Sequence, residues 1–397
     1  MIETSLEAPS LQREKKLFFF VTILCVAIPG FAALKALCIL CLWAYTTSVG
    51  SVRASSIFWF LSVILNVAFC CEVAFLHDVP PVDTGNQLSR VVLFFLCLGI
   101  GASMADSRVF DRKTTDRLIL WLAFLSAILK ALILGAILSG RITLEAAQKG
   151  LGFETVTDDI GFGLQRLQFP SDIALIFFVA CYFGGRRKII DLLFLLSVTV
   201  SVFLSFSRYL FAAYALCLVI RFVRVRKLDT VSVAALSSIL IVGAIFSVSL
   251  SSRFSARGTQ DSDSTRTEQI ASLTDVIVQY PLLGTGMGSS VNGYKRSGTI
   301  PFSYEVQWYA LTMQFGSLGL AWFLVNLIAP LSICCKSPGK TGVFLVVFSL
   351  WLLAGFTNPL IISLGSAFGL SILMLSLTNE IGVSSPHPTF KTQDLTH

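Results

Sequence analysis

The segment SSIFWFLSVILNVAFCCEVAFL, residues 55–76, carries one charged side chain, that of Glu72, in a run of otherwise uncharged and mostly apolar residues. About 20 predominantly apolar residues are enough for an α-helix to cross the hydrocarbon core of a bilayer. Comparable runs recur along the 397-residue chain, in which 55% of the residues are hydrophobic and only 13% are charged. The sequence therefore predicts an all-α integral membrane protein rather than a soluble globular domain.

We expect about 12 transmembrane helices, because the chain holds eleven apolar runs and the first is long enough for two short helices. The runs are 17–50, 55–76, 90–105, 118–139, 169–184, 189–206, 209–222, 229–250, 305–330, 342–356 and 359–377. The first run is too long for the apolar part of a cleavable signal peptide, so we expect it to remain as an anchor.

Basic residues indicate the orientation of these helices. More than half of the 30 lysine and arginine residues fall in short segments on one side of the expected spans. These segments are the N-terminal tail, Arg53, 106–117, 186–188, 221–227 and 334–340. By the positive-inside rule that side is cytoplasmic, and both termini lie there. The most basic of these segments, 221–227, is interpreted as a topology and lipid-headgroup anchor, so no nucleic-acid partner is expected.

The orientation divides the chain into four parts. Residues 1–250 are expected to form N-terminal transmembrane helices, and 251–304 a large external loop that contains a short amphipathic helix. Residues 305–380 return to the membrane, and 381–397 form a cytoplasmic tail. The opposite side of the membrane also receives the shorter external segments 77–89 and 140–168.

All ten cysteines lie in expected spans or at their cytoplasmic ends, which predicts that no structural disulfide forms. The sequence has no pattern of histidine and cysteine ligands typical of a metal site. It also lacks a phosphate-binding glycine motif of the kind that ATP-driven pumps use. We therefore expect neither a metal nor another cofactor.

The external loop contains the stretch SRFSARGTQDSDSTRTEQ, residues 252–269, whose first part is interpreted as flexible. The segment TRTE, 265–268, is typical of a capping box, so a helix is expected to begin with Thr265 as its N-cap. Ile270, Leu273 and Ile277 follow at helical spacing and define a buried stripe. Arg266 lies on the same side and is expected to face the membrane domain.

The segment YPLLGTGMGSS, 280–290, should end this helix, because Pro281 cannot continue it. Three alternate glycines then predict a sharply folded turn, whose backbone N–H groups are also candidates for binding an oxyanion. PFSYEVQWYALTMQFGSLGLAWFL, 301–324, is predicted to be a membrane helix with Ser303 as its N-cap. Glu305 would lie in its first turn, where negative charge is favourable.

These motifs resemble the O-antigen ligase and polymerase superfamily of membrane glycosyltransferases, which act on polyprenyl-pyrophosphate glycans. The shared features are an arginine that opens an external helix, a turn of the form P-x-x-G-x-G-x-G, and a polar residue that leads into the next helix. LSFSRYLFAAYALCL, 204–218, is similar to the Ser-Arg motif of the family. LQRLQFPSDIALIFF, 164–178, resembles the segment in which an arginine precedes a Pro-polar pair. The resemblance covers roughly 160–330, and the N-terminal third matches only in hydropathy.

One departure from the family pattern concerns the residue that would act as catalytic base. Ligases of the family present a histidine just before the helix that follows the glycine turn, whereas this chain reads SYEVQWYA and has none there. The only external histidine is His77, in a different loop. The resemblance therefore favours the polymerase branch, with Glu305 as the available base.

Arg166, Arg208 and Arg266 lie on the external side, where basic residues are rare. Guanidinium groups bind phosphate oxygens bidentately and would stabilise a pyrophosphate leaving group without a metal. The candidate catalytic residues are Glu305, Arg266 and Arg208. The candidate substrate-binding residues are Arg166, Arg253, Arg257, Tyr304, Trp308, Gly284 and Gly286.

Each candidate also has a structural interpretation. An interfacial arginine can contact lipid headgroups, Glu305 can complement the helix dipole, and interfacial aromatic residues are common in membrane proteins. The glycines are most simply turn residues. Lys130 lies within an expected span, where it would either snorkel outward or pair with an acid.

The resemblance implies an enzyme that polymerises O-antigen or exopolysaccharide repeat units carried on undecaprenyl pyrophosphate, on the outer face of the bacterial inner membrane. It also implies contact with membrane lipids and partnership with a flippase and a chain-length regulator. One alternative is an O-antigen ligase that transfers glycan to lipid A-core, which a nearby external histidine such as His77 would favour. Another is a polysaccharide flippase or permease, for which ionisable residues at mid-membrane, Lys130 among them, would be typical.

Overall fold

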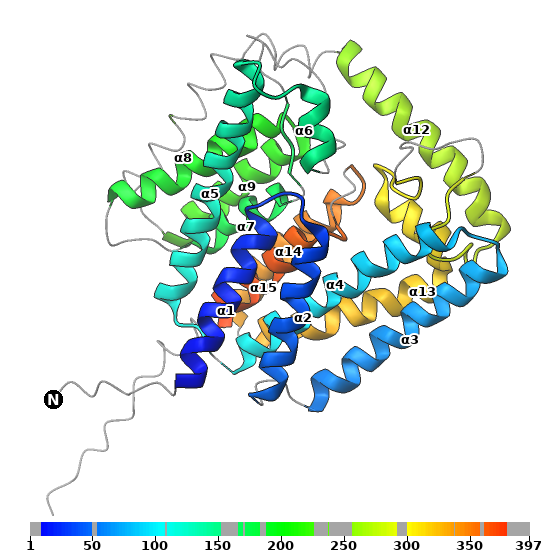
Figure 1. The fold of residues 1–397 in the computed structure, drawn as a ribbon, viewed down its shortest axis with the longest axis horizontal. Coiled ribbons are helices and arrows are strands. Elements are labelled where there is room, and N and C mark those ends of the chain that lie inside the picture. Colours follow the sequence, from blue (N-terminus) through cyan, green and yellow to red (C-terminus); the bar gives the residue numbers. More distant parts are fainter. Residues whose placement is uncertain are drawn as a thin grey trace, which may run out of the picture.

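The computed structural model describes residues 9–49, 54–107, 109–151, 166–169, 171–182, 188–225, 237, 256–291, 300–336, 338–357 and 361–378 (Figure 1). Within these ranges every regular element is a helix. The helices are α1 (Pro9–Val26), α2 (Ala32–Ser48), α3 (Ala54–Leu76), α4 (Pro81–Asp106), α5 (Arg112–Leu138), α6 (Leu144–Leu151), α7 (Asp172–Cys181), α8 (Lys188–Ser205), α9 (Arg208–Val225), α12 (Ala256–Gln279), α13 (Gln307–Leu331), η1 (Ser332–Lys336), α14 (Pro338–Ala354) and α15 (Leu364–Thr378).

The all-helical prediction is therefore confirmed for the described part of the chain. Four helical stretches there are long and apolar enough to cross a membrane, namely Ser56–Leu76, Pro81–Asp106, Arg112–Leu138 and Gln307–Cys335. Five further apolar helices are shorter, with 10–17 residues each. The expected span 229–250 lies, apart from residue 237, outside the described residues. The number of about 12 spans thus stays a prediction.

Two fully enclosed helices form the centre of the molecule. All ten residues of α7 are buried, and so is every residue of α15 after Leu364, as expected for helices that are apolar on all sides. α15 packs against both α4 and α7. In the view of Figure 1, α3, α4, α12 and α13 lie on one side of this centre, and α5, α6, α8 and α9 lie on the other.

Small residues bring these central helices close together. Gly101 of α4 packs against Ser371 of α15, whose hydroxyl donates to the carbonyl of Cys97 at 3.1 Å. Gly369 of α15 packs in the same way against Ala174 of α7. Small side chains at helix contacts are typical of membrane bundles, because association there depends on close packing rather than on expulsion of water.

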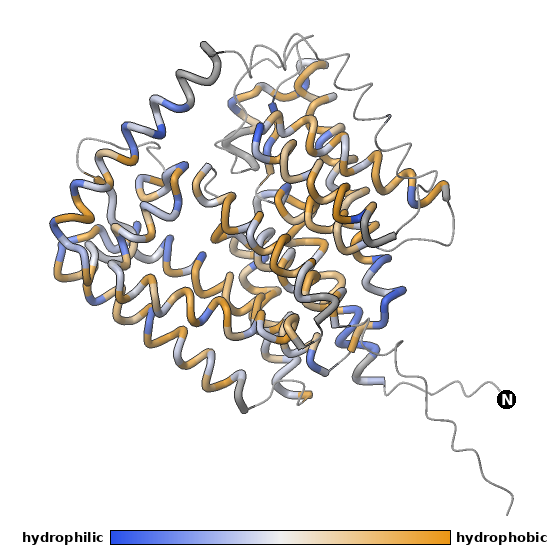
Figure 2. The backbone as a smooth tube through the Cα atoms, turned by 180° about the vertical axis from the view of Figure 1, so that it is seen from behind, coloured by the Kyte–Doolittle hydropathy of each residue, from blue (hydrophilic) through white to orange (hydrophobic). Residues whose placement is uncertain are grey.

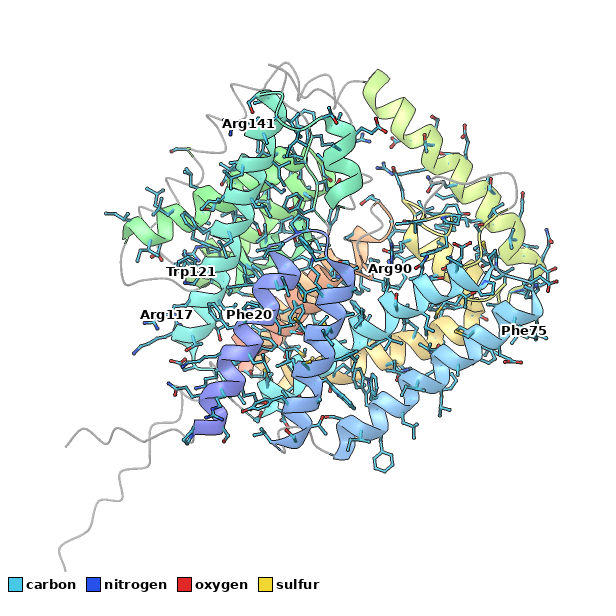
Figure 3. The ribbon with its side chains drawn as sticks, in the orientation of Figure 1. Phe20, Phe75, Arg90, Arg117, Trp121 and Arg141 are labelled. Atoms are coloured by element: carbon cyan, nitrogen blue, oxygen red, sulfur yellow. The ribbon has the colours of Figure 1, made fainter. Side chains whose placement is uncertain are left out.

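The outer surface is apolar, as a lipid-facing surface requires. Phe20, Phe75 and Trp121 have exposed fractions of 59%, 77% and 48%, and Figure 3 shows where they lie on the molecule. Along the backbone, hydrophobic residues dominate most helices, whereas hydrophilic residues are frequent in α12 (Figure 2). This distribution supports an integral membrane protein in which α12 is the polar element.

The start of α12 differs from the prediction. α12 begins at Ala256, so Thr265 lies inside the helix and the expected capping box is wrong. Asp263 forms an ion pair with Arg266 one turn later at 3.1 Å, and the Thr267 hydroxyl donates to the Asp263 carbonyl at 2.8 Å. The ion pair joins successive turns of α12 and stabilises the helix around Asp263, at the end of the stretch that was interpreted as flexible.

The start of α13 also differs. The helix begins at Gln307 with Val306 as its N-cap, so Ser303 is not the cap and Glu305 precedes the first turn. The physical reason is a contact from another helix. The backbone N–H of Glu305 donates to the Gln269 side chain of α12 at 2.9 Å, which holds this segment outside the helix.

The glycine turn between α12 and α13 docks into a break in α13. At Gly316 the backbone has φ 62° and ψ 179°, which interrupts the helix. The N–H groups of Ser317 and Leu318 donate to the carbonyls of Pro281 and Leu282, at 3.0 and 3.2 Å. The turn therefore satisfies donors that the break would otherwise leave unpaired inside the bundle.

The same docking satisfies acceptors on the other side of the break. The N–H groups of Thr285 and Gly286 donate to the carbonyls of Met313 and Gln314, at 2.9 and 2.8 Å. Gly284 has φ 71°, and a Cβ placed on it would overlap the backbone around Gly316. Turn and break thus form one interlocked unit, and the prediction that Pro281 ends α12 before a folded glycine turn is confirmed.

We expect Gly284→Ala and Gly316→Ala each to destabilise the protein. Left-handed backbone costs about 1–2 kcal/mol for a residue with a Cβ, and overlap with backbone atoms adds to that cost. The midpoint temperature of unfolding in detergent would measure the effect. Gly342→Ala in α14 is the control, because a Cβ there meets nothing within 4 Å. Wild-type midpoints for both variants would contradict the docked turn.

Candidate functional site

Four charged side chains form a continuous series where α9, α12 and the segment before α13 meet. Arg208 Nη2 lies 3.4 Å from Asp263 Oδ1, and Arg266 Nη1 lies 3.1 Å from the same oxygen. Arg266 Nε in turn lies 3.1 Å from Glu305 Oε2. We call Arg208, Asp263, Arg266 and Glu305 the charge chain. Residues that are distant in the sequence are thereby joined at one place.

The apolar stripe of α12 positions Arg266. Leu273 is fully buried in a cluster that includes Val306 and Met313 from the region of α13, and Ile270 and Ile277 pack against this cluster. Because one face of α12 is fixed in this way, Arg266 faces the bundle. The prediction for its direction is therefore confirmed.

The charge chain is partly open to solvent. The exposed fractions of its side chains are 28% for Arg208, 23% for Arg266, 21% for Glu305 and 52% for Asp263. Ion pairs at such positions contribute only about 0–1 kcal/mol to stability. Two guanidinium groups also converge on a single carboxylate oxygen of Asp263, so the same position suits an oxygen of a bound anion.

Arg166 lies at the corner that leads into Arg208. Its Nε donates to the carbonyl of Ser205, the last residue of α8, at 2.9 Å, and its Nη2 donates to Gln168 at 2.6 Å. Phe206 has φ 45° and makes the sharp corner between α8 and α9. Two of the arginines predicted to bind pyrophosphate are thus attached to the same corner.

Lys130 pairs with an acid, which was one of its two expected alternatives. Its Nζ lies 2.8 Å from Asp172 at the start of α7 and donates to the carbonyl of Ser201 in α8 at 2.9 Å. Both ionic side chains are buried. Asp172 also accepts the N–H of Phe169 at 2.9 Å, so the pair anchors the short segment that carries Arg166.

The predicted aromatic contacts with substrate have a packing role in this geometry. Tyr304 is 1% exposed, and its hydroxyl accepts the N–H of Val291 at 2.8 Å. Trp308 donates from its indole nitrogen to the carbonyl of Leu352 at 2.7 Å and so links α13 to α14. Whether these residues contact substrate stays a prediction.

The candidate glycines Gly284 and Gly286 also have packing roles in the structure. Gly284 lies against the break in α13, and a Cβ on Gly286 would overlap the backbone of Ala74 in α3. Of the two remaining candidates, Arg253 lies outside the described residues. Arg257 falls in the first turn of α12, and its side chain lies outside the described part of the structure.

His77 does not approach the charge chain. Its ring makes an edge-to-face contact with Tyr280, with 4.7 Å between the ring centroids. Tyr280 follows the end of α12 and lies 14 residues after Arg266, which corresponds to about 20 Å along a helix. His77 therefore lies at the C-terminal end of α12, whereas Arg266 lies near the middle of that helix.

The sequence analysis missed Asp263 and Gln269. Both carry a signal that could have identified them, because each lies three residues from Arg266 and therefore near it on a helix. Asp263 was overlooked because its segment was interpreted as flexible. Among the described residues no group of histidine, cysteine and acidic side chains is suited to a metal, and the ten cysteines are free.

Comparison with known families gives one match. Residues 192–324 match the family model described as O-antigen ligase, which confirms the resemblance for that third of the chain. The matched region contains every residue of the charge chain. Searches of curated proteins and of solved structures gave no match. The findings support a membrane enzyme that processes glycans.

We expect Asp263→Asn to strengthen binding of inorganic pyrophosphate several-fold, because the neutral amide no longer competes for Arg208 and Arg266. Loss of an interaction worth up to about 1 kcal/mol corresponds to about a fivefold change in affinity. Titration calorimetry of the purified full-length protein would measure it. Asp275→Asn, at an exposed position of the same helix, is the control. Weaker binding by Asp263→Asn would mean that the carboxylate positions the arginines instead.

Proposed function

We propose that this chain, which matches the O-antigen ligase family over residues 192–324, is a metal-independent membrane glycosyltransferase that polymerises lipid-linked glycan repeat units. The donor is the growing glycan on undecaprenyl pyrophosphate, and the acceptor is a second lipid-linked repeat unit. The product belongs to an O-antigen of lipopolysaccharide or to an exopolysaccharide. The observation that carries this proposal is the charge chain, in which two guanidinium groups meet at one oxygen and one of them also binds the Glu305 carboxylate.

In the proposed reaction an acceptor hydroxyl oxygen attacks the anomeric carbon of the donor. The bond between that carbon and the pyrophosphate oxygen breaks, and its electron pair leaves with the lipid pyrophosphate. Arg208 and Arg266 bind the leaving group and stabilise its growing negative charge, with Arg166 nearby. Guanidinium groups suit this role because they remain charged and match phosphate oxygens in geometry.

Glu305 takes the proton of the acceptor hydroxyl. A carboxylate can act as a general base when it lies within hydrogen-bond reach of the attacking group. Arg266 binds Glu305 through Nε, while its Nη1 points to the anion position occupied by Asp263. One arginine therefore fixes the distance between the base and the leaving group, which is the orientation that a displacement reaction requires.

Among the described residues no histidine lies beside the charge chain, which supports a polymerase over a ligase. The segment 303–310 contains none, and His77 is held against Tyr280 at the far end of α12. The ligase that transfers glycan to lipid A-core stays the second candidate, because the matching family model is described by that activity. For a flippase or permease, Lys130 was the main argument, and its closed pair with Asp172 gives it a structural role instead.

The proposal assigns the site to the outer face of the bacterial inner membrane, with both termini in the cytoplasm. Contacts between helix ends that are expected outside support this topology. Arg208 at the start of α9 meets Asp263 of α12, and Trp308 near the start of α13 donates its N–H to Gly355 after α14 at 3.3 Å. A flippase that supplies the substrate and a chain-length regulator are proposed partners.

Gel analysis of surface glycan in a null strain tests the proposal. We expect Arg208→Ala, Arg266→Ala and Glu305→Gln to leave single-repeat glycans where the wild type gives a ladder. Loss of an electrostatic stabiliser or a general base typically lowers rates by about 10²-fold or more. Arg141→Ala, at an exposed external arginine outside the matched region, is the control.

Immunoblots would confirm equal amounts of each variant. A normal ladder from all three variants would exclude the charge chain as the catalytic site. Loss of glycan from lipid A-core, with polymer still present on its lipid carrier, would identify a ligase instead.

A further inference from the structure

A small polar cavity adjoins the segment that carries Glu305. It has a volume of about 40 Å³. The residues with polar side-chain groups that line it are Gln87 and Arg90 from α4, Ser303 and Tyr304 from the segment before α13, and Gln307 and Gln314 from α13. Glu305 is not itself a lining residue, but it lies between two lining residues, Ser303 and Gln307, in the sequence.

We propose that this cavity binds hydroxyl groups of the acceptor saccharide, with Arg90 at its mouth. This inference rests on the proposed function, because it supplies the acceptor site that the charge chain lacks. Amides and hydroxyls both donate and accept hydrogen bonds, as sugar hydroxyls do. A single arginine among neutral groups matches a saccharide better than a pyrophosphate, which requires several positive charges.

The volume of the cavity also suits hydroxyl groups of a saccharide. A cavity needs about 10–15 Å³ to hold one water-sized group, so this cavity holds about three such groups. That is enough for hydroxyl substituents but not for a whole sugar ring or a polyprenyl tail. The ring itself would therefore lie outside the mouth, beside the exposed side chain of Arg90.

Hydrogen bonds hold the two glutamine side chains at the floor of the cavity in place. Gln87 Nε2 donates to Gln314 Oε1 at 2.6 Å, and Gln314 Nε2 donates to the carbonyl of Ser289 at 3.0 Å. The N–H of Gly288 donates to Gln87 Oε1. Both amides are buried and oriented by the glycine turn, so binding would not require their ordering.

Arg90 is a further external arginine that the sequence analysis did not select. It opens the expected span 90–105, as Arg208 directly precedes the span 209–222. Its guanidinium carbon lies 5.5 Å from the ring centroid of Phe302, a cation–π contact that directs it toward the cavity. Figure 3 labels Arg90 near the middle of the molecule, whereas Arg117 and Arg141 lie at its periphery.

Because two of its lining residues flank Glu305 in the sequence, the cavity would place the acceptor saccharide for proton transfer. A general base must lie about 2.6–3.2 Å from the hydroxyl whose proton it takes. Residues two apart in the chain have Cα atoms within about 7 Å, which is close to the width of one sugar ring. A saccharide whose hydroxyls occupy the cavity would therefore present a neighbouring hydroxyl to Glu305.

The test uses the full-length protein in nanodiscs and two probes. One probe is the repeat-unit oligosaccharide released by mild acid from the glycan of the same strain, and the other is inorganic pyrophosphate. We expect Arg90→Ala to weaken binding of the oligosaccharide at least tenfold and to change binding of pyrophosphate less than twofold. Arg208→Ala should show the opposite pattern, and Arg141→Ala should change neither.

Ser303→Ala provides a second, milder variant if Arg90→Ala fails to fold, and it should also weaken binding of the oligosaccharide alone. The inference is overturned if the wild type does not bind the oligosaccharide, or if neither substitution changes that binding. It is also overturned if Arg90→Ala weakens binding of pyrophosphate instead. If the wild type binds the oligosaccharide through Arg90 but does not bind pyrophosphate, the saccharide site stands and the proposed donor site fails.

Discussion

The exchange of backbone hydrogen bonds between the glycine turn and the break at Gly316 is the interaction on which the site depends. A broken helix inside a membrane protein leaves N–H and C=O groups without water to bind, at a cost of several kcal/mol for each group. Here the residues after Pro281 supply both the missing acceptors and the missing donors. Neither the turn nor the break would be stable without the other.

The interlocked unit sets the positions of the functional groups. It fixes the C-terminal end of α12 against α13, so the apolar stripe of α12 packs on the segment that leads into α13. Arg266 is thereby brought to Glu305, and Gln269 holds the Glu305 backbone. The same turn orients Gln87 and Gln314 in the polar cavity. One backbone arrangement thus supports both the charge chain and the proposed saccharide site.

Sequence patterns predicted the helices, the buried stripe of α12 and the direction of Arg266, because these depend on the periodicity of apolar residues. They did not predict that α12 begins well before Thr265, nor that α13 begins only after Glu305, whose backbone N–H binds Gln269 of a different helix. Asp263 was missed because its segment was interpreted as flexible, and Arg90 was missed because its role depends on a distant partner, Phe302. Such contacts leave no periodic signal along the chain.

The break at Gly316 also sets the depth at which chemistry would occur. The helical stretch Gln307–Cys335 has 29 residues, more than a bilayer core requires. The part from Gly316 to Cys335 is about 30 Å long and is sufficient on its own to cross that core. The segment from Gln307 to Phe315, about two and a half turns, would then stand at the level of the lipid headgroups. Arg266, which pairs with Glu305, would meet the pyrophosphate of the proposed lipid-linked donor there while the polyprenyl tail stays in the hydrocarbon, so that donor need never leave its own leaflet.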